Sequence, residues 1–333
     1  MSPKLRVLAA SQGGVFRKGQ ALARGHSRQD FRRRVSAKEW VQVRHGIYAE
    51  SAWVALFAGS PFLDAAARRL AMGADTVISH ETAAQLQGME LMTPYDGEPR
   101  LTVVRDPGSE PARVQGLYAA AVPPEHRDTF RGVPITTAPR TAADCARSMS
   151  RHAAVVTVES ALAQGLSRSV VLAVLEDCRG WPGARRARDI VEFASERSET
   201  ALESLGRCWF FDQGIPQPEQ QRDIYGSDGR WVARVDFVWE GMRTVGELDG
   251  RTKYVDLDRD GSALWREKLR EDRLRDLGLE VVRGYWSDGD DGGAGLAERL
   301  RRAFARGSRA AGEPAYLIKE PPVRRPGPLS RAS

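Results

Sequence analysis

At 333 residues, with 41% hydrophobic and 28% charged side chains, the sequence is typical of a globular protein with two or three domains. No stretch approaches the roughly 18 consecutive apolar residues of a membrane span, and no apolar signal segment opens the chain, so we expect a cytoplasmic protein without a membrane partner. Three widely separated cysteines, Cys145, Cys178 and Cys208, exclude a disulfide framework and a C-x-x-C zinc site and are expected in the core.

Positive charge is concentrated at the start of the chain. Residues 1–50 hold eleven lysines and arginines against three acidic residues, a net charge of +8 that leaves −2 for the remainder of the overall +6. A basic segment joined to a nearly neutral body favours a polyanionic partner, most commonly nucleic acid. The alternatives are a solvated basic surface or a protein-interaction domain.

The first domain, expected over residues 1–55, combines short helices with a hairpin. Ser27 can cap the third helix, and Phe31 and Val35 then face inward. Three helices followed by a terminal hairpin is the winged helix-turn-helix plan, in which the third helix contacts DNA. Proteins of this plan often act as dimers, so a homodimer is one expectation. The elements are predicted as helices at 4–10, 18–24 and after Ser27, and a hairpin of residues 40–44 and 47–48 around a His45-Gly46 turn.

The third helix and the hairpin carry the side chains expected to contact DNA. Arginines suit phosphate oxygens and guanine edges, and glutamine suits adenine. The expected nucleic-acid-binding residues are Arg28, Gln29, Arg32, Arg33 and Arg44. The three consecutive arginines from Arg32 to Arg34 cannot all face one groove, so some would lie along phosphates and carry little sequence information.

Two motifs in this segment resemble the N-terminal domain of the AbiEi family of antitoxins. They are Gly13-Gly14-Val15-Phe16 and Val43-Arg44-His45-Gly46-Ile47-Tyr48. The resemblance implies a transcriptional repressor or antitoxin of a type IV toxin–antitoxin locus, with a cognate nucleotidyltransferase toxin as a partner.

Residues 56–196 predict an α+β middle region. Ser79 and Ser167 are candidate helix caps, and Pro139 and Pro182 suit first helical turns. No catalytic constellation is recognisable here. The runs 135–144 and 181–188 look like segments of AbiEi-like proteins and suggest a connecting scaffold. Helices are expected at 62–72, 80–87, 139–149, 153–164, 168–178 and 183–194, and strands at 101–105, 117–122 and 133–136.

The third domain, expected over residues 197–310, has the order helix, three strands, helix, strand, which is typical of an α/β layer arrangement. Residues 287–295 are expected to form a flexible Asp/Gly loop, and 311–333 a disordered Pro/Arg-rich tail. The whole chain is thus expected to be an α/β multidomain protein. The predicted elements are helix 199–212, strands 221–225, 231–239 and 243–248, helix 262–277 and strand 279–285.

Three acids interrupt the apolar strands of this domain. Glu247 and Asp249 alternate along one strand and therefore share a face, and a hairpin partner can bring Asp236 beside them. Crowded carboxylates repel one another unless a cation lies among them, and oxygen ligands favour Mg²⁺ or Mn²⁺ over zinc. The expected metal ligands are Asp236, Glu247 and Asp249.

Residues 197–290 resemble the PD-(D/E)XK nuclease superfamily, in particular the branch of very short patch repair endonucleases. The resemblance implies a restriction-endonuclease-like α/β fold with Mg²⁺ or Mn²⁺ as cofactor. It gives catalytic roles to Glu203, Asp236, Glu247, Asp249, Lys253 and Lys268. The position two after Glu247 holds Asp249 in place of the usual lysine, so Lys253 or Lys268 would supply the cation near the developing oxyanion.

Each of these residues also has a structural alternative. Arg234 could pair with Asp236, the Asp249-Gly250 dipeptide is a turn signal, and Lys268 could form an exposed salt bridge. The sequence therefore predicts a DNA-binding protein with a magnesium-dependent endonuclease-like domain, involved in phage defence or a toxin–antitoxin locus. The rival interpretations are a non-catalytic repressor or antitoxin, and a protein–protein adaptor without DNA affinity.

Overall fold

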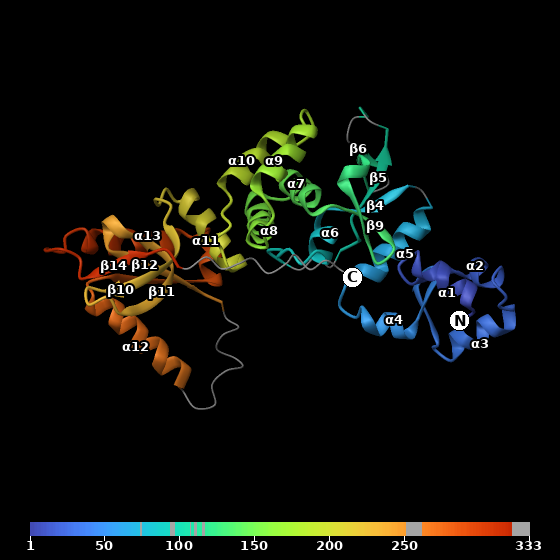
Figure 1. Ribbon diagram of the computed structural model, residues 1–333, viewed down its shortest axis with the longest axis horizontal. Helices are drawn as coiled ribbons and strands as arrows, with labels where there is room; N and C mark the ends of the chain where they lie inside the picture. The colour runs from blue at the N-terminus through green and yellow to red at the C-terminus, as the bar shows by residue number, and fades with distance from the viewer. Residues whose placement is uncertain are drawn as a thin grey trace. The chain divides into compact units, whose positions relative to one another are not determined.

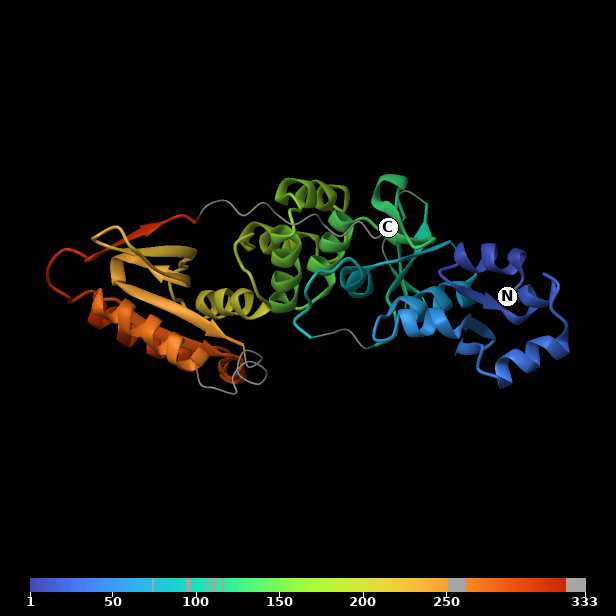
Figure 2. The same cartoon turned by 60° about the horizontal axis from the view of Figure 1, so that its bottom comes forward.

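The computed structural model describes residues 1–73, 75–93, 97–106, 108–109, 112–114, 117–250 and 262–321. The chain forms two compact units, one from Met1 to Ala194 and one that begins at Ser195 (Figures 1 and 2). Three sheets and their helices confirm the α/β multidomain class. Across the described residues, every helix is too short or too polar to cross a lipid bilayer.

The first unit begins with short helices around a three-stranded antiparallel sheet of order β1-β3-β2. The three helices and the hairpin lie where the sequence predicts them, whereas strand β1, which has only three residues, was not predicted. The elements are α1 (Pro3–Ala10), β1 (Val15–Arg17), α2 (Lys18–Leu22), α3 (Arg28–Ser36), β2 (Trp40–Arg44) and β3 (Ile47–Glu50).

An aromatic cluster anchors α3 to this small sheet. Phe31 of α3 meets Trp40 edge-on with ring centroids 5.4 Å apart, and Phe16 meets the same ring at 4.9 Å. The helix begins where the Ser27 hydroxyl accepts a hydrogen bond from the Asp30 N–H at 3.0 Å, which satisfies one of the free donors of the first turn. Phe31 is therefore fixed inward, and the polar side of α3 faces solvent.

The rest of the first unit is a six-stranded mixed sheet followed by a group of helices. The sheet order is β6-β7-β5-β4-β9-β8. Apolar side chains of α5 and this sheet pack with Val15 and Ile47 of the N-terminal sheet in one core. The elements are α4 (Ser51–Leu56), α5 (Phe62–Met72), β4 (Thr76–Ile78), α6 (His80–Leu86), β5 (Leu101–Arg105), β6 (Ala112–Val114), β7 (Leu117–Ala121), η1 (Pro124–His126), β8 (Arg127–Phe130), β9 (Val133–Thr136), α7 (Ala138–Ser148), α8 (Arg151–Ala163), α9 (Arg168–Asp177) and α10 (Ala184–Phe193).

The second unit is a five-stranded sheet of order β13-β12-β11-β10-β14. β12 and β13 are parallel, and the other neighbours are antiparallel. Figure 1 shows the strands between α12 and α13; α12 packs on β11 and β13, and α11 packs on β12. The elements are α11 (Ala201–Asp212), β10 (Glu219–Gly226), β11 (Trp231–Trp239), η2 (Glu240–Met242), β12 (Thr244–Asp249), α12 (Ser262–Asp276), β13 (Glu280–Tyr285), η4 (Trp286–Asp291), α13 (Ala294–Gly307) and β14 (Tyr316–Lys319).

Two segments of this unit differ from the sequence expectations. The Asp/Gly segment is not a flexible loop but forms η4 and leads into α13, which buries Leu296, Leu300 and Ala303 along one face. Part of the tail expected to be disordered forms β14, because Tyr316 is buried and the strand pairs with β10. The Pro/Arg-rich composition of the tail as a whole concealed this short apolar strand. Cys145, Cys178 and Cys208 are buried free thiols, as predicted.

Candidate functional site

The outer face of α3 presents polar side chains to solvent. Arg28, Gln29 and Arg32 are exposed, and no described residue forms a hydrogen bond or ion pair with their side chains. A guanidinium held in solvent without a carboxylate keeps its full capacity for phosphate or base contacts. These three predicted DNA contacts therefore lie together on one accessible helix.

The following two arginines of α3 are engaged within the domain. Arg33 and Arg34 both donate to the Asp30 carboxylate, and Arg34 also donates to Glu39 at 2.6 Å. Hydrogen bonds from His26, above all, and from Arg33 lower the pKa of Asp30. Arg33 was predicted to contact DNA; its side chain remains exposed, but its charge is already shared with an acid.

Arg44, the fifth predicted DNA contact, joins the hairpin to α5. Its guanidinium donates to both oxygens of Asp64 and, at 2.9 Å, to Glu98. The hydrogen bond to Asp64 is the largest cause of its raised pKa. This arrangement is a bidentate ion pair that fixes the hairpin, and the predicted role in DNA binding stays a prediction.

The acids of the second unit meet where β11 and β12 diverge. The last paired residues are Phe237 and Gly246, so Asp236 and Glu247 occupy the next position of the register. The Leu248 N–H donates to Asp236 Oδ2 at 2.9 Å in place of a continued ladder. The end of the β11–β12 ladder brings these two carboxylates together without a backbone hydrogen bond between their residues.

Glu203 of α11 is the third acid of this cluster. Gln221 of β10 connects it to Asp236, because its amide nitrogen donates to Glu203 Oε2 at 2.9 Å and lies 3.4 Å from Asp236 Oδ1. Glu203 also accepts from the Thr200 hydroxyl at 3.0 Å and the Glu199 N–H at 2.9 Å. Burial and then the charge of Asp236 raise the pKa of Glu203 to about 7.

Glu247 is the most perturbed acid of the cluster. The residue is 5% exposed, and its Oε2 accepts from Arg270 of α12 at 2.9 Å. Its Oε1 is buried and has no hydrogen-bond partner among the described residues. Burial and the charge of Asp236 raise its pKa to about 8 in spite of Arg270. An unpartnered buried carboxylate oxygen is costly, so this oxygen is a site for a proton or a cation.

Asp249, predicted as a metal ligand beside Glu247, is held by Arg283 of β13. The same guanidinium donates to Glu267 and Glu271 of α12, so one arginine balances three carboxylates. Asp249 thus takes part in an ion-pair network at the end of β12, and its predicted metal role stays a prediction. The residues that would complete the turn suggested by Asp249-Gly250 lie outside the described ones.

Of the two predicted lysines, Lys268 forms no hydrogen bond or ion pair with these acids among the described residues. Lys253 lies outside the described residues, and Lys268 is exposed on α12. Arg234, the suggested partner of Asp236, instead donates to Gln221 at 3.0 Å and lies 3.3 Å from Glu199. The contacts of Gln221, Arg270 and Arg283 were not predicted, since each joins elements far apart in the sequence.

A metal ion needs several ligands that converge on one point, so the arrangement of the described side chains decides whether one can bind. Among them, no three His, Cys, Asp or Glu side chains lie in an arrangement that could hold a metal ion. Mg²⁺, however, is commonly bound by one or two carboxylates together with substrate phosphates. Asp236 and Glu247 fit a site with two carboxylate ligands. Among the described residues, Glu247 Oε1 has no hydrogen-bond partner, and the charge of Asp236 opposes the ionisation of Glu247.

Comparisons with known proteins place the chain among bacterial relatives. Residues 4–51 match the sequence model of a family described as "Transcriptional regulator, AbiEi antitoxin". Two Mycobacterium tuberculosis proteins, from strains CDC 1551 and H37Rv and both described as uncharacterized, are 30% identical over 276 residues, which cover 82% of this chain and 94% of each relative. The N-terminal match supports the predicted antitoxin-type regulator with affinity for DNA. The chain belongs to the same family as these two mycobacterial proteins.

Proposed function

We propose that this protein is a DNA-binding transcriptional regulator of the antitoxin type, which contacts DNA through α3 in a winged-helix arrangement. The observation that carries the proposal is the exposed, unpaired set Arg28, Gln29 and Arg32 on α3, inside the segment that matches the AbiEi antitoxin regulators. The net charge of +8 over residues 1–50 attracts a polyanion to the same domain.

The arginines of α3 fall into an unpaired set and an ion-paired set, and this difference decides which of them we expect to contact DNA. Arg28 and Arg32 lie four residues apart and therefore on the same side of the helix, with Gln29 adjacent. Arginine can bind guanine or phosphate, and glutamine can bind adenine in the major groove. Arg33 and Arg34 must first give up Asp30 or Glu39 to bind DNA, so they contribute less.

A binding assay on the DNA upstream of the gene tests this proposal. The Arg28→Ala/Arg32→Ala variant should lose affinity by about tenfold or more, because two phosphate or base contacts disappear. Arg33→Ala is the matched control, since it removes an exposed arginine of the same helix that is already ion-paired, and it should weaken binding less. Binding that the double variant leaves unchanged would show that α3 is not the interface.

An antitoxin also has partners of its own. We propose a homodimer, as winged-helix proteins often form, and a cognate nucleotidyltransferase toxin encoded nearby, which the antitoxin resemblance implies. Light scattering of the purified protein measures the first. Co-expression of the neighbouring gene measures the second: growth arrest by that gene alone, relieved by this protein, is the expected result, and arrest that persists would remove the toxin partnership.

A second candidate function belongs to the acidic cluster of the second unit: hydrolysis of phosphodiester bonds with Mg²⁺ or Mn²⁺, in phage defence or within the same locus. The unpartnered Oε1 of Glu247 beside Asp236 favours it. These two carboxylates would hold the ion, which would supply charge neutralisation at a phosphate. Gln221 orients Glu203 and Asp236, Arg270 fixes Glu247, and Glu203 can hold or release a proton near neutral pH.

Calorimetric titration with MgCl₂ and MnCl₂, followed by incubation with supercoiled plasmid, tests the second candidate. Asp236→Asn and Glu247→Gln should abolish both metal uptake and nicking. Glu280→Gln is the control: Glu280 is an acid of β13 that pairs with Arg306, and its replacement should leave both intact. Metal uptake without nicking would favour a non-catalytic nucleic-acid-binding domain. Absence of both would remove the hydrolase candidate.

A further inference from the structure

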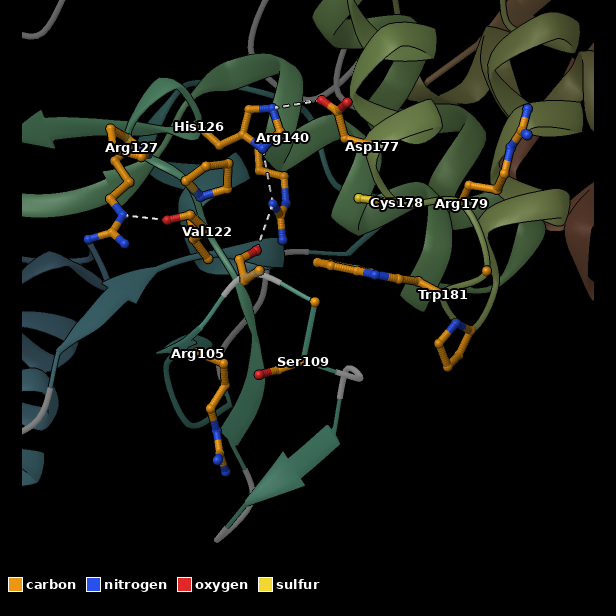
Figure 3. A pocket seen from close by; sticks show the side chains of 16 residues that line it. Arg105, Ser109, Val122, His126, Arg127, Arg140, Asp177, Cys178, Arg179 and Trp181 are labelled. Carbon is orange, nitrogen blue, oxygen red and sulfur yellow. Dashed lines mark hydrogen bonds and ion pairs between the residues drawn. The ribbon is translucent and has the colours of Figure 1, made fainter.

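A cavity of about 740 Å³ lies in the first unit, among residues that neither proposed function uses. It is formed between the ends of β5 and β7, η1, α7 and the segment that joins α9 to α10. Figure 3 shows Arg140 and Trp181 extending toward each other in its lining, with His126 beside Arg140, while Arg105 and Arg179 extend away. The volume falls within the roughly 300–1,000 Å³ of small-molecule sites.

The buried charges beside this cavity do not balance. Arg140 and Arg147, both from α7, donate to the single carboxylate of Asp144 at 2.8 and 2.9 Å. The side chains of Arg140 and Asp144 are each 1% exposed, and that of Arg147 is 10% exposed. Asp144 is the sole acid within ion-pair distance of either guanidinium among the described residues. One positive charge is therefore in excess, and a buried charge without compensation is unfavourable.

Apart from Asp144, the described groups that contact the Arg140 guanidinium directly are neutral. Its guanidinium lies 3.2 Å from the Ala121 carbonyl and from His126 Nδ1, so Nδ1 accepts from it and His126 is neutral. Burial and the charge of Arg140 lower the pKa of His126. Asp177 lies 3.4 Å from His126 Nε2 and is largely solvated at the rim. Burial lowers the pKa of Arg140, but the charge of Asp144 and, more weakly, that of Asp177 raise it.

Part of the cavity wall is flat and apolar, beside further charged groups such as Arg105, Arg127 and Asp177. The guanidinium carbon of Arg140 lies 5.1 Å from the Trp181 ring centroid, and that of Arg147 lies 5.0 Å from it. Val122, Pro123 and Pro182 supply further apolar surface in the lining. A cationic group stacked with an aromatic ring suits a ligand that combines an anion with a planar ring.

We propose that this cavity binds an organic phosphate bearing a planar ring, of the size of a mononucleotide. The phosphate would accept hydrogen bonds from Arg140 and neutralise the surplus charge, and the ring would pack against Trp181 and the prolines. The region between the N-terminal domain and α10 is then a ligand-binding module, and not solely a connecting scaffold.

Calorimetry on the full chain with three probes tests the proposal: AMP, adenosine and inorganic phosphate. AMP should bind, and adenosine and phosphate should each bind about tenfold or more weakly, because each supplies half of the recognition. Trp181→Leu should weaken AMP by about tenfold and Trp181→Phe less, since phenylalanine keeps an aromatic wall. Arg188→Gln, an exposed arginine of α10 paired with Glu176, should bind as the wild type does.

Arg140→Gln removes the phosphate partner and leaves Asp144 bound to Arg147. With unchanged circular dichroism it should abolish AMP binding. If Arg140→Gln fails to fold, the comparison of Trp181→Leu with Trp181→Phe still tests whether AMP binds in this cavity. AMP affinity that is absent at millimolar concentration, or equal in the wild type and Trp181→Leu, overturns the proposal; adenosine and AMP binding equally would overturn its anionic part.

Discussion

The arginines of α3 and the acids of the second unit differ in whether their charges are exposed and unpaired or buried and paired. On α3, Arg28 and Arg32 are exposed and form no ion pair with a described acid. In the second unit, Glu247 and Asp249 of β12 are buried and accept from Arg270 and Arg283, whereas the half-buried Asp236 of β11 accepts from the Leu248 N–H. Among the described residues of this cluster, Oε1 of Glu247 is buried without a hydrogen-bond partner.

The difference shows why a charged residue type alone does not define a site. An exposed, unpaired arginine costs little to maintain and is immediately available to a phosphate. A buried acid requires a partner, and Arg270 and Arg283 supply one to Glu247 and to Asp249 within the same unit. The oxygen left over at Glu247 is what distinguishes the cluster from a completed ion-pair network.

The largest expected effect is on stability. Arg283→Ala leaves Asp249, Glu267 and Glu271 without their shared partner and should lower the free energy of unfolding by about 3 kcal/mol. Urea unfolding measures it. Arg306→Ala, which removes an exposed pair with Glu280, should have a much smaller effect. Equal effects would mean that the Arg283 network does not stabilise the sheet.

Arg44→Ala separates structure from DNA contact in the first unit. Loss of the bidentate pair with Asp64 and of the Glu98 contact should cost about 2 kcal/mol in stability. Its effect on DNA affinity should be smaller than that of Arg28→Ala/Arg32→Ala. Full stability combined with a large loss of affinity would make Arg44 a DNA contact.

Stability should also depend on pH through Glu247. Its pKa is about 8 in the fold against an ordinary value of 4.5, so over this range the folded chain holds a proton that the unfolded chain has released. The free energy of unfolding should therefore fall as pH rises from about 5 to 8. Glu247→Gln should flatten this dependence and stabilise the protein above pH 8 by about 1–3 kcal/mol.

Unfolding curves at several pH values, with and without MgCl₂, check this prediction. A divalent ion at Asp236 and Glu247 should reduce the loss of stability at high pH in the wild type but not in Glu247→Gln. An identical slope in both proteins would mean that Glu247 is not the titrating group.

The smallest expected effect concerns the helix that presents the free arginines. Ser27→Ala removes the hydroxyl that accepts from the Asp30 N–H and should cost about 1 kcal/mol. Ser27→Asn, which preserves a capping oxygen, should restore most of it. If both substitutions lower the melting temperature equally, the cap does not stabilise α3.

Much of the fold could be predicted from local signals. The helices of the first unit follow apolar periodicity and capping residues, such as Ser167 before α9 and Pro139 in the first turn of α7. Strands of three residues, such as β4 and β6, are too short to show alternation, and they were not predicted. β14 depends on pairing with β10 across about 90 residues, which no local pattern reveals.

In the candidate sites too, the residues with a local sequence signal could be predicted and their long-range partners could not. Asp236 and Glu247 were identifiable because an acid inside an apolar strand is unusual, and the exposed face of α3 follows from the inward position of Phe31. The side chains that engage these residues come from other elements: Gln221 from β10 and Arg270 from α12. Such contacts depend on strand register and helix placement, which the sequence does not display.

The salt dependence of DNA binding tests the central claim most directly. Arg28 and Arg32 are unpaired on α3, so binding through them should release counterions from DNA. The slope of log Kd against log salt should decrease by about two in Arg28→Ala/Arg32→Ala relative to the wild type, with a smaller change in Arg33→Ala. A slope that is the same in the wild type and the double variant would contradict the account.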